Sequence, residues 1–227
     1  LKQQGYDVVG LFMRNWEYGI KGSQCPNRIE FEDAKKVGEL IGIEVIGKDF
    51  VEEYRTKVFD VFLEGLKKGL TPNPDILCNR EIKFNVFLTE AKKMGADMIA
   101  TGHYAKIAFY KDHYVLDTPK DNSKDQSYFL HALSSEQLSH AMFPLGDLTK
   151  KEVREIAREH NLPVSDKKDS TGICFIGNQR FDDFITQHLK AIPGDIIDEN
   201  GKVLGKHKGL ICYTLGQRKG IGLGGIK

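Results

Sequence analysis

The first hundred residues alternate between short apolar runs and longer stretches with helical periodicity. The predicted order is strand 7–13, helix 31–41, strand 43–46, helix 50–66, helix 81–94 and strand 97–101. A continuous apolar run of strand length is typical of a strand buried on both faces, as in parallel sheets. Strands alternating with helices therefore predict an α/β fold with a parallel sheet.

The end of the third predicted strand is a candidate binding position. In open parallel sheets, ligands bind beyond the carboxyl ends of the strands. Thr101, Gly102, His103 and Tyr104 follow such an end. Gly102 would let a ligand approach the backbone closely. His103 alone fits a structural role as well as a functional one, so both interpretations stay open.

Local signals predict several further elements. Asp49 with Glu52 resembles an N-terminal helix cap, and the apolar stripe of the helix that follows indicates core packing. The members of that stripe are Phe50, Tyr54, Val58, Val61, Phe62 and Leu66. Lys111 and Asp112 lie at the centre of a predicted hairpin, 107–117.

The second half of the chain changes character near residue 190. Capping boxes at Ser134 with Gln137 and at Thr149 with Glu152 predict helix starts, and 181–189 reads as another helix. Beyond these, strands at 195–198 and 203–204 on either side of the Asn200–Gly201 turn predict a hairpin, and 210–214 is a further predicted strand. We therefore predict an α/β domain over 1–140, a helical continuation over 141–190 and the start of a small β domain over 191–227. Both ends of the chain are expected to be cuts inside a longer protein.

The segment TPNPDILCNREIKF, residues 71–84, carries the first candidate for chemistry. Pro72 and Pro74 predict a stiff, non-helical approach to Cys78, with a helix beginning shortly after it. A thiol near a helix N-terminus has a lowered pKa and is a better nucleophile. The alternative is that Cys78 is a small buried hydrophobe. Asp75 could act as an acid or base, or could stabilise a turn.

A second cysteine, Cys174, lies in the segment DSTGICFIG. Two separated thiols can carry out sulfur transfer, because one can hold a persulfide while the other attacks it and leaves a disulfide. The other two cysteines, Cys25 and Cys212, have no assigned role, and the spacing of the four predicts no metal site. With no secretory signal, we expect a reducing, cytoplasmic setting.

Bulk charge does not identify a partner. The formal net charge is +1, and the basic residues gather in three local clusters that are most simply solvated surface. The clusters are Lys150, Lys151, Arg154 and Arg158; Lys167 and Lys168; and Lys202, Lys206, Lys208, Arg218 and Lys219. No apolar run approaches the roughly 20 residues of a membrane span, so we expect no membrane partner.

Five motifs in order resemble the tRNA-specific 2-thiouridylase family (MnmA/TrmU type). They are TPNPDILCN, TGHYA, KDQSYFL, DSTGICFIG and GQRKGIGLGG. The resemblance implies a PP-loop ATPase (HUP-like) adenine-nucleotide-binding domain. It also implies ATP-dependent adenylation of the C2 oxygen of the wobble uridine. Sulfur from a cysteine persulfide then gives 2-thiouridine and AMP, and a persulfide sulfur-donor protein is the further partner.

The resemblance also implies roles for residues. Cys78 matches the nucleophile and Cys174 the persulfide carrier, with Asp75 beside the target base. Met13 and Gly102 match positions that contact ATP, which would bind with Mg²⁺. The positions that match tRNA contacts are Asn73, Pro74, Asp75, His103, Lys124, Asp125 and Gln126.

Three interpretations stay open. One is the thiouridylase, another is a different PP-loop adenylating enzyme, and the last is a non-catalytic tRNA-binding fragment. The family's Ser-Gly-Gly-x-Asp-Ser phosphate loop and its C-terminal barrel are not in this sequence. A phosphate loop holds pyrophosphate through backbone N–H groups. We therefore expect this polypeptide alone not to complete the reaction.

Overall fold

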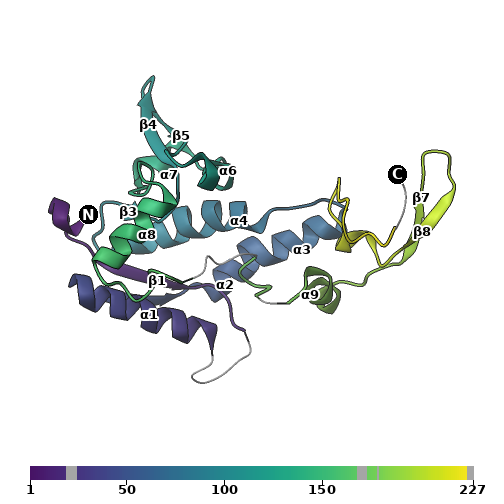
Figure 1. Cartoon of the computed structure of the whole chain (residues 1–227), viewed down its shortest axis with the longest axis horizontal. Coiled ribbons are helices and arrows are strands. Elements are labelled where there is room, and N and C mark those ends of the chain that lie inside the picture. The colour runs from purple at the N-terminus through teal and green to yellow at the C-terminus, as the bar shows by residue number, and fades with distance from the viewer. Residues whose placement is uncertain (19–24, 168–172, 178, 224–227) are drawn as a thin grey trace. The chain divides into compact units, whose positions relative to one another are not determined.

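The computed structural model describes residues 1–18, 25–167, 173–177 and 179–223 (Figure 1). The chain forms two compact units. The first comprises Leu1–Val58 and Asp75–Thr171, and the second comprises Phe59–Pro74 and Gly172–Lys227.

The first unit contains most of the helices and strands. Its first elements are a 3₁₀ turn (Lys2–Gln4), β1 (Gly10–Arg14), α1 (Pro26–Ile41), β2 (Val45–Asp49), α2 (Val51–Tyr54) and a π-helical stretch (Arg55–Phe59) that leads into the second unit. The next are α4 (Pro74–Leu77), a π-helix (Cys78–Phe87), α5 (Leu88–Lys93), β3 (Ile99–Ala100), β4 (Lys106–Tyr110) and β5 (His113–Asp117). The last are a 3₁₀ turn (Asn122–Lys124), α6 (Ser127–Leu130), α7 (Ser135–Ser139), β6 (Ala141–Met142) and α8 (Lys150–Glu159).

The second unit is smaller. It contains α3 (Asp60–Lys67), α9 (Phe181–His188), β7 (Gly194–Ile197), β8 (Val203–His207) and a 3₁₀ turn (Leu210–Cys212). Strands β7 and β8 form an antiparallel hairpin. The predicted strand at 210–214 is therefore wrong. The first three of its residues coil into a 3₁₀ turn, and in the described part of the chain no strand pairs with them.

Parallel pairing confirms the predicted α/β fold. Strand β1 pairs with β2 from Gly10↔Val45 onward, and β3 pairs with β6 from Ile99↔Ala141. Helix α1 packs on the first pair, and Gly38 permits this approach. A Cβ atom at Gly38 would lie 2.4 Å from Cγ2 of Val45, so any larger residue would push the helix away.

Each unit has its own apolar core. In the first unit the buried cluster joins the π-helix and α5 to β3, β6 and α6; its members are Phe84, Leu88, Ala91, Ile99, Ala105, Leu130 and Ala141. In the second unit the aromatic rings of Phe59, Phe62, Phe175 and Phe184 pack together. Most of the predicted stripe along α2 and α3 is buried, but Val61 is 46% exposed, so its assignment to the core was wrong.

Element boundaries differ from the predictions where tertiary pairing decides them. Strand β1 begins at Gly10 rather than residue 7, because β2 runs beside it only from Val45. Helix α1 begins at Pro26, five residues before the predicted start, since proline is well tolerated in a first helical turn. Asp49 is not an N-cap but the last residue of β2. Its Oδ1 still accepts a 3.0 Å hydrogen bond from Val51 N–H.

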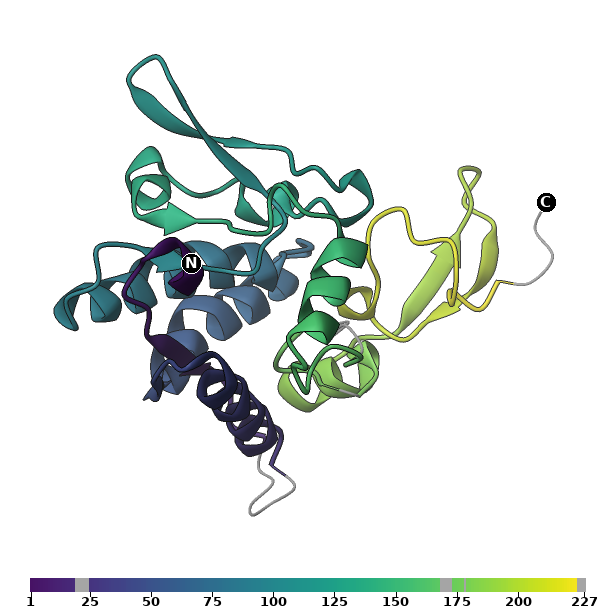
Figure 2. The ribbon, with the colours of Figure 1, turned by 60° about the vertical axis from the view of Figure 1, so that its left-hand side comes forward.

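Apart from the cap predicted at Asp49, the signals that act within one turn were confirmed. Both predicted capping boxes form, at Ser134 and at Thr149. The β4–β5 hairpin turns at Lys111 and Asp112, both with positive φ, and projects from the rest of its unit (Figures 1 and 2). None of the described helices is long and apolar enough to cross a membrane.

Candidate active site

Cys78 lies inside a helical segment, which corrects the predicted rigid loop. Helix α4 begins at Pro74, in the first helical turn, where proline costs nothing. The π-helix then begins at Cys78 itself, and only 3% of the cysteine is exposed. The thiol is therefore held in a buried turn of helix, and the argument from a nearby helix N-terminus does not apply.

The π-helix is supported by a side chain from outside it. Phe84 departs from helical geometry (φ −99°, ψ 16°), which disturbs the regular backbone hydrogen bonds. Nε2 of Gln137 donates to the carbonyl oxygens of Arg80 (3.0 Å) and Phe84 (2.9 Å). Long π-helical stretches are rare and frequently lie at functional sites.

Two further contacts join three of the sequence motifs in the first unit. Asn79 is buried, and its Nδ2 donates a 2.9 Å hydrogen bond to the carbonyl oxygen of Phe129. Tyr104 N–H donates to Oε1 of Gln126, and Gln126 N–H donates to the carbonyl oxygen of Tyr104, both at 3.0 Å. The structure therefore brings TPNPDILCN, TGHYA and KDQSYFL together.

Asp75 is partly withdrawn from water. Burial raises the pKa of its carboxyl group, and the positive charge of Lys83 offsets part of that effect. A carboxyl group with a raised pKa is better matched to proton transfer near neutral pH. This environment favours the acid–base interpretation of Asp75.

His103 is held as a neutral imidazole. Its Nδ1 lies 2.7 Å from Thr101 Oγ1, and its Nε2 lies 3.5 Å from Nζ of Lys83. Its ring also packs near the rings of Phe84 and Phe143. Burial, assisted by the charge of Lys83, lowers the pKa of His103 to about 3. A neutral ring with fixed partners can serve a structural and a binding role at once.

The predicted ATP positions lie at the carboxyl ends of two strands. Met13 is the fourth residue of β1, paired in register with Lys48, and Gly102 follows β3. A Cβ atom at Gly102 would meet only Leu145, at 3.7 Å, so open space adjoins the backbone there. This opening fits a nucleotide that lies against the main chain.

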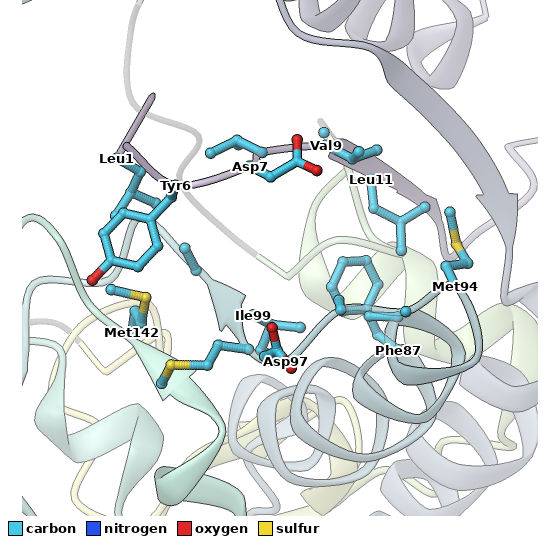
Figure 3. Close-up of a pocket in the computed structure, with 17 residues that line it drawn as sticks. Leu1, Tyr6, Asp7, Val9, Leu11, Phe87, Met94, Asp97, Ile99 and Met142 are labelled. Carbon is cyan, nitrogen blue, oxygen red and sulfur yellow. The ribbon is translucent and has the colours of Figure 1, made fainter. Parts of the chain in front are cut away.

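A cavity of about 610 Å³ lies beside this region, between β1 and β3 (Figure 3). Val9 and Leu11 lie along one side of it and Ile99 along another, with Phe87 on the helical side. Its lining consists mainly of apolar side chains, and it includes neither Met13 nor Gly102. We therefore do not assign this cavity to the nucleotide.

Cys174 belongs to the second unit and is exposed. The two residues that follow it are buried, Phe175 to 1% exposure and Ile176 to 7%. The ring of Phe175 lies 5.0 Å from that of Phe59 and 5.4 Å from that of Phe62. The cysteine is thus presented to solvent on a backbone that its neighbours anchor.

The other predicted contacts lie in varied settings. Pro74 is buried and Asn73 half-buried, whereas Lys124 is exposed. Asp125 is exposed as well, and its Oδ1 accepts a 2.8 Å hydrogen bond from Ser127 N–H at the start of α6. Asp125 therefore has a structural contact as well as its predicted contact with RNA.

The remaining cysteines differ from these two. Cys25 is the N-cap residue of α1. Burial, together with the charge of Asp182, raises the pKa of Cys212 and disfavours its thiolate. Among the described residues, no group of histidine, cysteine and acidic side chains could hold a metal ion.

Three residues of this site were not predicted from the sequence: Asn79 as an anchor, Lys83 and Gln137. Asn79 and Lys83 lie within the TPNPDILCNREIKF segment, yet their roles depend on the π-helix. The sequence predicted only the capping box of Gln137. Its hydrogen bonds to the carbonyl oxygens of Arg80 and Phe84 join residues 57 and 53 positions apart, so no local pattern indicates them.

Known proteins are similar over the whole chain. A family model described as the tRNA methyl transferase HUP domain matches residues 1–178, and one described as the tRNA methyl transferase PRC-barrel domain matches 182–227. The chain is 92% identical over 227 residues to tRNA-specific 2-thiouridylase MnmA 2 of Aliarcobacter butzleri (strain RM4018). It is 51% identical over 229 residues to tRNA-specific 2-thiouridylase MnmA of Delftia acidovorans (strain DSM 14801 / SPH-1). All of this chain is covered in both comparisons, and it spans 62% of the length of each relative.

Proposed function

Because the chain belongs to the tRNA-specific 2-thiouridylase family, the family of the tRNA methyl transferase HUP domain, we propose that it carries the sulfur-transfer site of a tRNA-uridine 2-sulfurtransferase. The observation that carries this proposal is the setting of Cys78. The thiol is buried in a π-helix whose segment also holds Asp75 and Lys83, and this segment is tied to two other motifs. If Cys78 served only to fill space in the core, it would not require Asp75 and Lys83 in the same segment or the contacts to the two other motifs.

In the proposed reaction Cys174 holds the incoming sulfur. Its exposed position suits collection of a persulfide from a donor protein. The terminal sulfur of that persulfide attacks C2 of the target uridine, and the activated C2 oxygen leaves. The thiolate of Cys78 then attacks the inner sulfur, on Cys174. The S–S bond breaks and the sulfur stays on C2, so the product is 2-thiouridine.

The electrons balance through the two cysteines. The transferred sulfur is reduced as its bond to Cys174 breaks, and Cys78 and Cys174 are oxidised to a disulfide. An external dithiol must reduce this disulfide before the next turnover. Asp75 exchanges a proton with the base, in keeping with its raised pKa.

ATP is the cofactor that this proposal requires. When bound, it supplies the adenylyl group that makes the C2 oxygen a leaving group, and Mg²⁺ would accompany its phosphates. Met13 and Gly102, at the ends of β1 and β3, would contact it. The tRNA would meet Asn73, Pro74, His103, Lys124, Asp125 and Gln126.

The description of the family model and the names of the relatives differ in the group transferred, methyl in one and sulfur in the other. Both concern tRNA. A persulfide relay requires two thiols with different tasks, and the chain offers a buried one and an exposed one. Sulfur transfer is therefore the function we favour.

The experiment that tests this proposal follows the sulfur. The protein is incubated with a cysteine desulfurase and cysteine, and persulfides are alkylated and mapped by peptide mass spectrometry. Extra sulfur should be found on Cys174 and not on Cys25 or Cys212. In a longer version that also carries the family's phosphate loop and C-terminal barrel, addition of ATP, Mg²⁺ and tRNA should then give a uridine with the mass of an oxygen-to-sulfur exchange. A methyl mass, or persulfide spread evenly over all four cysteines, would contradict the proposal.

A further inference from the structure

Lys83 occupies an unusual position for a lysine. It is half-buried, and its neighbours in sequence, Ile82 and Phe84, are both 0% exposed. It follows Cys78 by five residues in the π-helix Cys78–Phe87. The repeating hydrogen bond of a π-helix joins residue i+5 to residue i, whereas that of an α-helix joins i+4 to i. Lys83 therefore follows Cys78 by one hydrogen-bond repeat of the π-helix.

The contact between Lys83 and His103 determines the tautomer of the imidazole. An ammonium group has only donors to offer. Nζ of Lys83 lies 3.5 Å from Nε2 of His103, so that nitrogen must present its lone pair rather than an N–H group. The proton of the neutral ring is then on Nδ1, and Nδ1–H donates to Oγ1 of Thr101 across 2.7 Å.

Thr101 alone does not determine the tautomer of His103. A threonine hydroxyl can donate or accept, so it suits either tautomer of a neighbouring histidine. The rings of Phe84 and Phe143 hold the imidazole in place but offer no strong hydrogen-bond partner. Lys83 is therefore the group that fixes the direction of this short hydrogen-bond chain.

We propose that Lys83 is a positioning residue of the sulfur-transfer site, which holds His103 as the Nδ1–H tautomer. The role of Lys83 in sulfur transfer rests on the proposed function, whereas its effect on the tautomer of His103 does not. The same charge opposes the effect of burial on the pKa of Asp75 and so keeps more of that carboxylate ionised. One ammonium group thus orients the imidazole of His103, and through it the hydroxyl of Thr101, and it also offsets part of the effect of burial on Asp75.

The first test reads the tautomer directly and needs neither ATP nor tRNA. Long-range ¹H–¹⁵N correlation spectra of the histidine rings distinguish protonated from unprotonated ring nitrogens. For His103 in the unaltered chain, Nδ1 should carry the proton at pH 7. In Lys83→Met the Nε2–H tautomer should become populated, and Lys83→Arg should retain the original pattern. Lys92→Met, on the exposed surface of α5, is the matched control and should leave the spectrum unchanged.

The second test measures how much Lys83 contributes to the rate of tRNA thiolation. In tRNA thiolation assays of the longer version that carries the phosphate loop and the C-terminal barrel, Lys83→Met should lower kcat by about tenfold or more with KM for tRNA changed less than about threefold. Lys83→Arg should recover part of the rate. An unchanged His103 spectrum in Lys83→Met overturns the positioning role whatever the activity. Absence of thiolation by the unaltered longer version counts against the proposed function and leaves the tautomer result standing.

Discussion

Tyr104 and Gln126 hold each other through two hydrogen bonds of 3.0 Å, one to the side chain of Gln126 and one between backbone groups. The residues are 22 positions apart. The pair fastens the loop after β3 to the segment before α6. It thereby joins two motifs that the sequence presents separately.

Removing the side chain of Gln126 should loosen this junction. Gln126→Ala leaves the N–H of Tyr104, a residue that is 5% exposed, without its acceptor, which should cost about 1–3 kcal/mol. Gln126→Glu keeps the acceptor and should cost less. Urea unfolding at pH 7.5 measures both changes. Gln3→Ala, at an exposed position, is the control, and an equal loss in that variant would contradict the explanation.

The π-helix should depend on Gln137. In Gln137→Ala the carbonyl oxygens of Arg80 and Phe84 lose their donor, and the capping box of α7 is broken as well. A loss of about 1–3 kcal/mol is expected for the carbonyl of Phe84, which is partly buried, and a smaller loss for that of Arg80, which is near solvent. Amide hydrogen exchange should accelerate between residues 78 and 87. Ser134→Ala breaks the capping box alone, so a similar acceleration there would assign the effect to the cap.

Stability should depend on pH through His103. The folded pKa is about 3, against about 6.5 in the unfolded chain. Below pH 6.5 the unfolded state binds a proton that the folded state does not take up until near pH 3. This group therefore lowers the free energy of unfolding by about 1.4 kcal/mol per pH unit as the pH falls through that window. His103→Gln should remove this part of the slope in urea unfolding from pH 7.5 to 4.5, and the exposed His113→Gln should not.

The cysteines should differ in their rates of alkylation. Cys174 is exposed and should react with iodoacetamide at least about tenfold faster than Cys78, which is 3% exposed. Cys212 should also be slow at pH 7, since burial raises its pKa. Peptide mapping over time gives each rate. Faster modification of Cys78 than of Cys174 would show that the site opens in solution.

The position of Cys174 at the surface should depend on the buried aromatic ring of the next residue, Phe175. Phe175→Ala removes a ring that is 1% exposed and contacts Phe59, Phe62 and Phe184, so a loss of about 3–5 kcal/mol is expected. Thermal unfolding measures the loss. Leu215, in the same unit, is 87% exposed, and Leu215→Ala should have almost no effect. Persulfide loading of Phe175→Ala at low temperature separates misplacement of Cys174 from unfolding.

Local sequence signals succeeded where the physics is local. Both capping boxes and both hairpins were predicted correctly, because a cap or a tight turn is decided within four or five residues. The alternation of strand-length apolar runs with helical stretches also predicted the parallel α/β fold correctly. The strand ends were less accurate, since a strand extends only as far as its neighbour lies beside it.

By itself, the sequence determined the α/β class, the family and the two cysteines with the motifs around them, because these depend on periodicity and on residue identity. Only the tertiary structure decided how Cys78 is held. Pro72 and Pro74 predicted a loop, but a buried Phe84 and the amide of Gln137 stabilise a π-helix instead. That winding, and the contact of Lys83 with His103 twenty residues later, arise from packing between distant segments, so no local pattern could predict them.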